Sequence, residues 1–326
     1  MTTRVAVVGA SGYAGALCAH LVQRHPSLEL TAVTARGEAG RRHDELYPQY
    51  RVPLTLQELD VDEIAGRADA ALVAYPHGAA AEAVRDLRAR ALKVVDLSAD
   101  FRLDQESYER WYAEHGAPEL IGEAVYGLTE LHRDEIRAAD LVAAPGCYPT
   151  AAILALAPLR ELAEDAVVDA KSGVSGAGRE ATQSTHFVSV TENVNPYKVE
   201  GHRHRAELER ELDGVRVTFI PHLLPIEQGL LASCYVTPRE PVEPEQVRTL
   251  FEAAYADEAF VELSDVPPGT RDVRGTNRCR IHATVDRNTG RVLAFAAIDN
   301  LWKGAAGQAV QDLNLMLGLP ESEGLT

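Results

Sequence analysis

Short apolar runs alternate with helix-type patterns through the first half of the chain. The runs are Val5–Val8, Leu30–Val33, Ala70–Ala74, Leu92–Leu97 and Asp140–Ala144. Short runs of this kind are typical of strands that are buried on both faces of a parallel sheet. The segments Ala14–Arg24 and Ala79–Arg90 between them have helical periodicity. The alternation predicts an α/β fold with a doubly wound parallel sheet.

The pattern changes after Pro149. A helical segment, Ala151–Leu162, is followed by a Gly/Ser segment, a polar stretch and then longer strand patterns: Val215–Ile220, Leu230–Thr237, Cys279–Asp286 and Val292–Ile298. These predict an α+β domain on a mostly antiparallel sheet. The helical pattern returns at Ala305–Leu317 and is closed by Gly318. We therefore expect one domain of residues 1–146 and 303–326, and a second of residues 147–302.

Composition narrows the possible partners. The formal charge of −17 would repel a phosphate backbone, so nucleic acid is not an expected partner. The N-terminus lacks a signal-peptide pattern and no apolar run is long enough to span a membrane, which predicts a cytoplasmic protein without a membrane partner. The four cysteines are scattered, with no histidine at ligand spacing, so neither a disulfide framework nor a metal site is expected.

A glycine-rich loop follows the first predicted strand and opens a helix. Its motif, GxxGxxG, spans Gly9, Gly12 and Gly15. In this context glycines let the backbone approach a pyrophosphate, whose charge the helix N-terminus favours, so the first domain is interpreted as Rossmann-like. The alternative is a tight strand-to-helix turn that binds nothing.

The end of the second strand bears on the choice of dinucleotide. An NAD-binding fold usually has an acidic residue there for the ribose hydroxyls. Here Thr34 is followed by Ala35 and Arg36, and an arginine suits the 2′-phosphate of NADP. The prediction is NADP, with a merely solvated Arg36 as the alternative.

Cys147 lies in Pro145-Gly146-Cys147-Tyr148-Pro149-Thr150, between an apolar strand and a helix. A helix N-terminus stabilises a thiolate, so Cys147 is the candidate nucleophile. The other cysteines lie in apolar helix or strand patterns and are interpreted as core residues.

Two histidines, His202 and His204, offer an imidazole for acid–base chemistry. Because they are two residues apart in a segment taken as extended, we expect them to point to opposite sides. A surface cluster and a metal site stay open as alternatives. Arg102, after another strand end, could clamp a phosphate or carboxylate, or could instead form a structural ion pair with Asp100 or Asp104.

Together these segments resemble the N-acetyl-gamma-glutamyl-phosphate reductase family of the aspartate-semialdehyde dehydrogenase superfamily, over essentially the full length. The motifs that carry the resemblance are Gly9–Gly15, Tyr75–Gly78, Asp96–Arg102, Ala144–Thr150, Lys171–Arg179, Gly201–His204 and Ile298–Gly304. One departure is Gln228, where many members have arginine.

The resemblance implies NADPH-dependent reduction of an acyl phosphate to an aldehyde through a thioester on Cys147, in arginine biosynthesis. It implies His204 as the acid/base, and Arg102, Ser98 and His202 as substrate-binding residues. The implied cofactor-binding residues are Gly9, Ser11, Gly12, Tyr13, Gly15, Thr34, Arg36, Ser175, Gly176 and Asn300. The resemblance also implies a homo-oligomer that acts on a small anionic acyl phosphate.

Two other functions remain open at this stage. A related reductase of lysine biosynthesis acts on aminoadipyl phosphate linked to a carrier protein and also resembles the chain. A non-catalytic NADP-binding sensor would use the same glycine loop, but it would have no need of a reactive Cys147.

Overall fold

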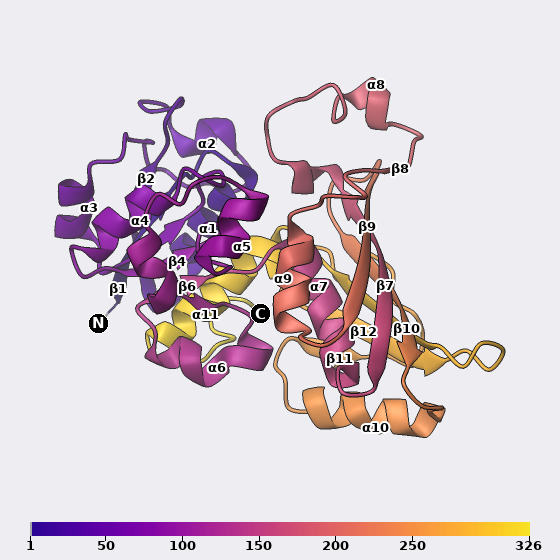
Figure 1. The fold of residues 1–326 in the computed structure, drawn as a ribbon. Helices are drawn as coiled ribbons and strands as arrows, with labels where there is room; N and C mark the ends of the chain where they lie inside the picture. The colour runs from indigo at the N-terminus through magenta and orange to yellow at the C-terminus, as the bar shows by residue number, and fades with distance from the viewer. Residues whose placement is uncertain (1) are drawn as a thin grey trace. The chain divides into compact units, whose positions relative to one another are not determined.

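A computed structural model describes residues 2–326. They form two compact units. One holds the chain up to Pro145 together with Ala305–Thr326, and the other holds Gly146–Gly304. Figure 1 shows the course of the chain through both.

Within the described residues, the first unit contains a six-stranded sheet of order β2-β1-β3-β4-β6-β5, in which all neighbouring strands are parallel. Its strands are β1 (Thr3–Val8), β2 (Leu28–Thr34), β3 (Ala70–Val73), β4 (Lys93–Asp96), β5 (Val125–Tyr126) and β6 (Leu141–Ala143). The order reverses next to β1, and ligands of such sheets bind at the carboxyl ends of the strands at this point. The loop that follows β1 is therefore placed to bind a ligand.

Helices pack around this sheet. They are α1 (Tyr13–Arg24), α2 (His43–Leu46), α3 (Val61–Arg67), α4 (Ala81–Arg88), α5 (Gln105–Trp111), η1 (Pro118–Glu123), α6 (Thr129–Ala138) and α11 (Gly307–Met316). The last helix, α11, is buried along its whole length and contacts α1, α6 and β4. Its Asp312 accepts hydrogen bonds from the Thr129 hydroxyl (2.8 Å) and the Gln308 amide (2.9 Å), which ties α11 to α6.

The second unit contains a seven-stranded sheet of order β11-β12-β13-β10-β7-β9-β8, counted over the described chain. Its strands are β7 (Ala163–Gly173), β8 (Asn195–Pro196), β9 (Arg216–Leu224), β10 (Leu230–Pro238), β11 (Val261–Leu263), β12 (Cys279–Val285) and β13 (Val292–Ile298). The pairs β7/β9 and β11/β12 are parallel, and the remaining pairs are antiparallel. The predicted fold class, a doubly wound parallel sheet plus a mostly antiparallel one, is confirmed.

Helices and turns complete the second unit: α7 (Cys147–Leu156), η2 (Ala157–Leu159), η3 (Val174–Ala177), α8 (Phe187–Val190), α9 (His204–Glu211) and α10 (Pro244–Tyr255). The π-helical turn η4 (Trp302–Ala306) begins at the end of this unit and leads into α11. Helix α7 packs on β10 and β13, and all of its residues after Cys147 are buried. Its N-terminus is thus held rigidly by the core of this unit.

The short strands β5, β8 and β11 were not predicted, and two longer elements also depart from the expectations. Strand β7 was not among the predicted strands, although buried and partly exposed residues alternate along it and it pairs on both edges. Helix α9 replaces the extended segment expected at His204. It begins after Arg203 without a side-chain cap, so the usual start signal is missing from the sequence.

Candidate active site

Cys147 is the first residue of α7 and is partly exposed. Gly146 precedes it as the N-cap, and its carbonyl accepts the Thr150 hydroxyl at 3.1 Å. The first N–H groups of a helix lack intrahelical partners and favour negative charge, so a thiolate at Cys147 is favoured by its position. In the described chain none of the four cysteines forms a disulfide, and Cys18, Cys234 and Cys279 are 0% exposed, as predicted for core residues.

The imidazole of His204 lies directly against Gly146. A Cβ built on Gly146 would stand 2.6 Å from His204 Nε2, so no other residue fits at this position without displacing the ring. The structure therefore brings the predicted acid/base next to the residue that precedes the predicted nucleophile.

Glu207 completes this arrangement from the next turn of α9. Its carboxylate is 0% exposed, accepts the Gly146 N–H at 3.0 Å, and lies 4.0 Å from His204 Nε2. A buried carboxylate at this distance attracts a positively charged imidazole and limits its rotation. We name Cys147, His204 and Glu207 the thiol cluster.

His202 lies beside His204, and the expectation that the two point to opposite sides is wrong. Their ring centroids are 4.7 Å apart, and His202 Nδ1 accepts the backbone N–H of His204 at 3.2 Å. The reason is that α9 begins at His204, so the two residues are not on one extended strand. The rings of Tyr148, Tyr197 and Phe219 also surround His202, whose burial lowers its pKa to about 4. His202 is therefore neutral at pH 7.

Two tyrosine hydroxyls lie next to this cluster. Tyr148 donates to the His222 carbonyl at 2.9 Å, and Tyr197 donates to the Tyr148 hydroxyl at 3.4 Å. Burial raises the pKa of Tyr197 to about 12, with a further contribution from Cys147. Both tyrosines stay protonated donors at neutral pH.

Asn300 joins the predicted cofactor residues of the second unit. Its Oδ1 accepts the Gly229 N–H at 2.8 Å, and its Nδ2 donates to the Ser175 hydroxyl at 2.9 Å. A Cβ on Gly176 would lie 3.7 Å from Asn300 Nδ2. Ser175, Gly176 and Asn300 are thus brought together, and we call them the Asn300 cluster.

The segment after Asn300 reaches Cys147. The Gly304 N–H donates to the Asp299 carbonyl at 3.0 Å, and a Cβ on Gly304 would stand 2.7 Å from Cys147 Cβ. The Asp299 side chain accepts the N–H groups of Leu301 (2.9 Å) and Trp302 (3.3 Å), which fixes this turn. Desolvation raises the pKa of Asp299.

In the first unit the glycine loop has the geometry of a dinucleotide cradle. Gly9 has φ +87°, and a Cβ on Gly15 would clash with the Gly9 carbonyl oxygen, so α1 can approach the loop only with glycine at position 15. Thr34 is 0% exposed, and its carbonyl accepts the N–H of Gly9 (3.1 Å), so it supports the loop from behind. The Tyr47 hydroxyl donates to the Ser11 carbonyl at 2.7 Å.

Other residues of the loop leave room for a ligand. A Cβ on Gly12 would have only the Gly9 carbonyl within reach, at 3.8 Å. Tyr13 is half-buried and meets the edge of Tyr47. The side of the loop at Gly12 is therefore open, as a site that binds a pyrophosphate requires.

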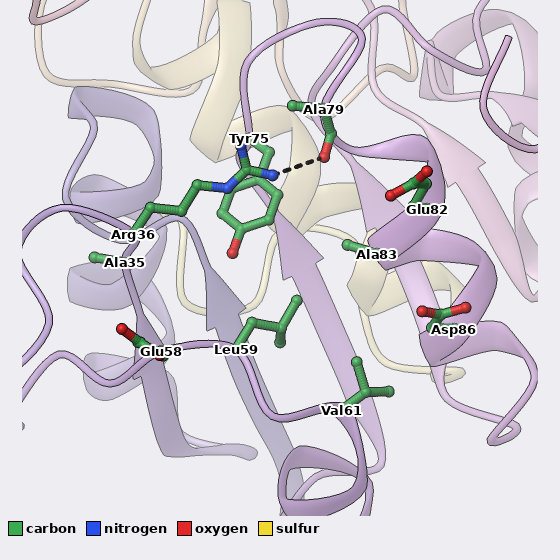
Figure 2. Close-up of a pocket in the computed structure, with 10 residues that line it drawn as sticks. All are labelled: Ala35, Arg36, Glu58, Leu59, Val61, Tyr75, Ala79, Glu82, Ala83 and Asp86. Carbon is green, nitrogen blue, oxygen red and sulfur yellow. Dashed lines mark hydrogen bonds between the residues drawn. The ribbon is translucent and has the colours of Figure 1, made fainter.

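A pocket of about 430 Å³ adjoins the end of β2. Figure 2 shows Arg36 lying across the Tyr75 ring, with the guanidinium carbon 4.7 Å from the ring centroid and Nη2 donating to the Ala79 carbonyl at 3.5 Å. Glu58, Glu82 and Asp86 also line the pocket. Arg36 is therefore held in place and faces a cavity, not solvent alone.

Ser98 and Arg102 lie at the carboxyl ends of β4 and β6. The Ser98 hydroxyl donates to Asp96 (2.6 Å) and accepts the Asp100 N–H (3.0 Å). Arg102 is 3% exposed and donates to the carbonyls of Ala144 (2.7 Å) and Leu97 (2.8 Å). Burial and the neighbouring Asp100 raise the pKa of Asp96 to about 7. Ser98 and Arg102, two of the three predicted substrate residues, thus form part of a buried polar network.

Sequence reasoning missed Glu207 and Tyr197. Glu207 follows His204 at the i,i+3 spacing of neighbours on a helix face, a signal that is readable only once α9 is predicted. Tyr197 is half-buried within an exposed stretch, and nothing local to the sequence distinguishes it.

Comparison with known proteins gives the family. A profile described as semialdehyde dehydrogenase, NAD binding domain, matches residues 4–139, and one described as semialdehyde dehydrogenase, dimerisation domain, matches residues 147–300. The N-acetyl-gamma-glutamyl-phosphate reductase of Moorella thermoacetica is 48% identical over 99% of this chain and 97% of its own length. The chain belongs to the N-acetyl-gamma-glutamyl-phosphate reductase family.

Further relatives agree with this assignment to the reductase family. The enzyme of that name from Pelotomaculum thermopropionicum is 47% identical, over 100% of this chain and 98% of its own. Aspartate semialdehyde dehydrogenase II of Vibrio cholerae has the same fold, with a TM-score of 0.75 at 19% identity, covering 98% of this chain and 99% of that one. The resemblance drawn from the motifs is confirmed, and the chain is an oxidoreductase. Across residues 2–326, no helix is long and apolar enough to cross a membrane.

Proposed function

We propose that this reductase-family chain converts N-acetyl-γ-glutamyl phosphate to N-acetylglutamate semialdehyde and phosphate in arginine biosynthesis, with NADPH as the reductant. The observation that carries the proposal is the thiol cluster, in which a helix-terminal cysteine, an imidazole and a buried carboxylate occupy adjacent positions. The full-length identity to reductases of that name supports the substrate.

In the first half-reaction the Cys147 sulfur attacks the γ-carbonyl carbon. The carbon–oxygen bond to phosphate breaks, and an acyl thioester remains on Cys147. His204 takes the thiol proton at the moment of attack and passes it to the departing phosphate. Glu207 holds the imidazole in position and stabilises its protonated form.

In the second half-reaction the thioester is reduced. Bound NADPH supplies the hydride. His204 passes one proton, taken up from solvent, to the resulting oxyanion. When the carbon–sulfur bond breaks, the aldehyde leaves and that proton ends on the Cys147 sulfur, which restores the starting state.

We assign candidate cofactor-binding residues in each unit taken by itself. Gly9, Ser11, Gly12, Tyr13 and Gly15 would hold the pyrophosphate, supported from behind by Thr34. Ser175, Gly176 and Asn300 would hold the nicotinamide side. NADP is proposed over NAD because Arg36 is fixed at the mouth of a pocket at the end of β2, where a 2′-phosphate would bind.

Other assignments follow from the same scheme. Arg102 and Ser98 would bind the anionic reacting end of the substrate. His202, which the resemblance implies for substrate binding, would also position His204, because its Nδ1 accepts the His204 N–H. The second unit, matched by the dimerisation-domain profile, would also form a homo-oligomer.

The test is oxidation of aldehydes in the reverse direction, with NADP and inorganic phosphate. The panel is N-acetylglutamate semialdehyde, aspartate semialdehyde and carrier-linked aminoadipate semialdehyde. The proposal requires that N-acetylglutamate semialdehyde has the highest kcat/KM. A preference for the carrier-linked aldehyde would assign the lysine-pathway reaction. Tight NADP binding without turnover of any aldehyde would indicate a sensor.

A further inference from the structure

The loop between β11 and β12 carries an exposed arginine at a fixed place. Arg274 Nη2 donates to the backbone carbonyl of Gln228 at 3.0 Å. The next residue, Gly275, donates its N–H to Asp299 Oδ2 at 2.8 Å. A Cβ on Gly229, where φ is +116°, would stand 2.7 Å from Thr270 Cβ, so the earlier part of the loop is packed closely on the Gln228-Gly229 turn. The backbone is thus anchored on both sides of Arg274.

The charge of Arg274 is not neutralised by a direct ion pair. Among the residues that the structure describes, no carboxylate lies within ion-pair distance of its guanidinium. Its positive charge is felt by the buried Asp299, whose pKa it lowers against the larger effect of burial. In a chain of net charge −17, an anchored and exposed arginine without a carboxylate partner is suited to bind an anionic ligand.

Two series of contacts within the second unit connect the loop of Arg274 to Cys147 and to the Asn300 cluster. Gly275 contacts Asp299, whose carbonyl holds Gly304 against Cys147. On the other side, Gln228 is followed by Gly229, which donates to Asn300. The backbone that carries Arg274 is therefore connected, through Gly275 and Asp299, to the turn that packs on Cys147.

We propose that Arg274 binds the α-carboxylate of the substrate and selects acyl phosphates that carry a free carboxylate at the far end of the glutamyl chain. This rests on the proposed function. Only one of the five guanidinium N–H groups is used in the bond to Gln228, so the others can form a two-point contact with a carboxylate. Every acyl phosphate carries the charged phosphate at its reacting end. A cation that meets the other end therefore distinguishes glutamyl substrates, which carry a carboxylate there, from acyl phosphates whose far end is uncharged.

The test compares two aldehydes in the phosphate-dependent oxidation: N-acetylglutamate semialdehyde and its α-carboxamide, which has the same shape without the charge. A hydrogen-bonded charge pair contributes about 1.5–3 kcal/mol, so Arg274→Gln should lower kcat/KM for the carboxylate about 10–100-fold, mainly through KM. The kcat/KM for the carboxamide should not change. Arg274→Lys should recover part of the loss.

Arg271→Gln is the matched control, because Arg271 is exposed in the same loop and has no hydrogen bond or ion pair in the described chain. It should leave both substrates unaffected. An equal loss for both aldehydes in Arg274→Gln, or a shift in NADP affinity of the same size, would overturn the assignment in favour of a structural role. If the wild-type enzyme oxidises neither aldehyde, it is the proposed function that fails.

Discussion

The imidazole of His204 occupies the space that a side chain at Gly146 would require. The nitrogen Nε2 lies 2.6 Å from where a Cβ of residue 146 would stand. Because Gly146 is also the N-cap of α7 and donates to Glu207, one residue sets the distance between the helix that carries Cys147 and the helix that carries His204.

Gly146→Ala should therefore displace the His204 ring and lower kcat. General acid–base catalysis raises a rate about 10²–10⁴-fold, so His204→Asn should lower kcat by about this factor. Gly146→Ala should cause a substantial part of the same loss in kcat. Steady-state kinetics of the three enzymes measure this. The control is Gly122→Ala, since a Cβ on Gly122 meets no atom within 4 Å. Wild-type kcat in Gly146→Ala would show that His204 can act from another position.

Cys147→Ser should abolish turnover and leave NADPH binding intact, because a hydroxyl loses its proton far less readily than a thiol and is a poor nucleophile even with His204 beside it. Iodoacetamide at pH 7 should modify Cys147 alone in the native wild type, since the other three thiols are 0% exposed. Mass spectrometry locates the label, and cofactor fluorescence gives the affinity. Activity within about tenfold of wild type, roughly 1.4 kcal/mol of barrier, would contradict the thioester mechanism.

Glu207→Gln keeps an acceptor for the Gly146 N–H but removes the charge next to His204. We expect kcat to fall about 10–100-fold, as when a carboxylate that orients a functional histidine is lost, with little change in Tm. Glu207→Ala should additionally destabilise the fold by about 1–3 kcal/mol, because a buried N–H loses its partner. Kinetics and thermal unfolding separate the two effects. Equal kcat in wild type and Glu207→Gln would show that Glu207 only accepts the Gly146 N–H and that its charge takes no part in catalysis.

Arg36→Asp should lower the preference for NADPH over NADH, because a carboxylate repels the 2′-phosphate that the guanidinium would bind. The ratio of kcat/KM for the two cofactors measures it. Arg51→Asp, a change of equal charge at an exposed position outside the pocket, should keep the wild-type ratio. An unchanged ratio in Arg36→Asp would place 2′-phosphate recognition at another residue.

The sequence predicted the fold well where elements have local signals. The buried runs of the first sheet and the glycine loop were recognisable because they are short, apolar and bounded by turns. Strand β7 was missed because a strand with charged residues on one face, Asp165, Asp169 and Lys171, lacks a continuous apolar run. Its place in the interior of the sheet depends on pairing with β9 and β10, which is tertiary information.

The candidate site was predicted only where its residues have local signals in the sequence. Cys147 was identifiable from its position between strand and helix. The relation between His202 and His204 was not, because it depends on where α9 begins, and that helix starts without a capping side chain. Burial of Glu207 against Gly146 joins residues 61 positions apart, and no local pattern contains it.

The buried ring of His202 makes the stability of the protein depend on pH in the acid range. Its pKa is about 4 in the folded protein, against a usual value of 6.5, because burial disfavours the charged ring. The unfolded chain therefore binds a proton that the folded chain does not, and the free energy of unfolding falls as the pH drops from about 6.5 towards 4. Between pH 7 and pH 5 this amounts to about 2 kcal/mol.

In His202→Asn that part of the pH dependence should vanish, whatever the variant's stability at pH 7. Urea unfolding of wild type and variant at both pH values measures the difference, in which the contributions of the other histidines cancel. His186→Asn is the control, because the His186 ring is exposed and solvated in both states. A wild-type pH dependence in His202→Asn would show that folding does not lower the pKa of His202, and the proposal that burial keeps this ring neutral beside His204 would then be wrong.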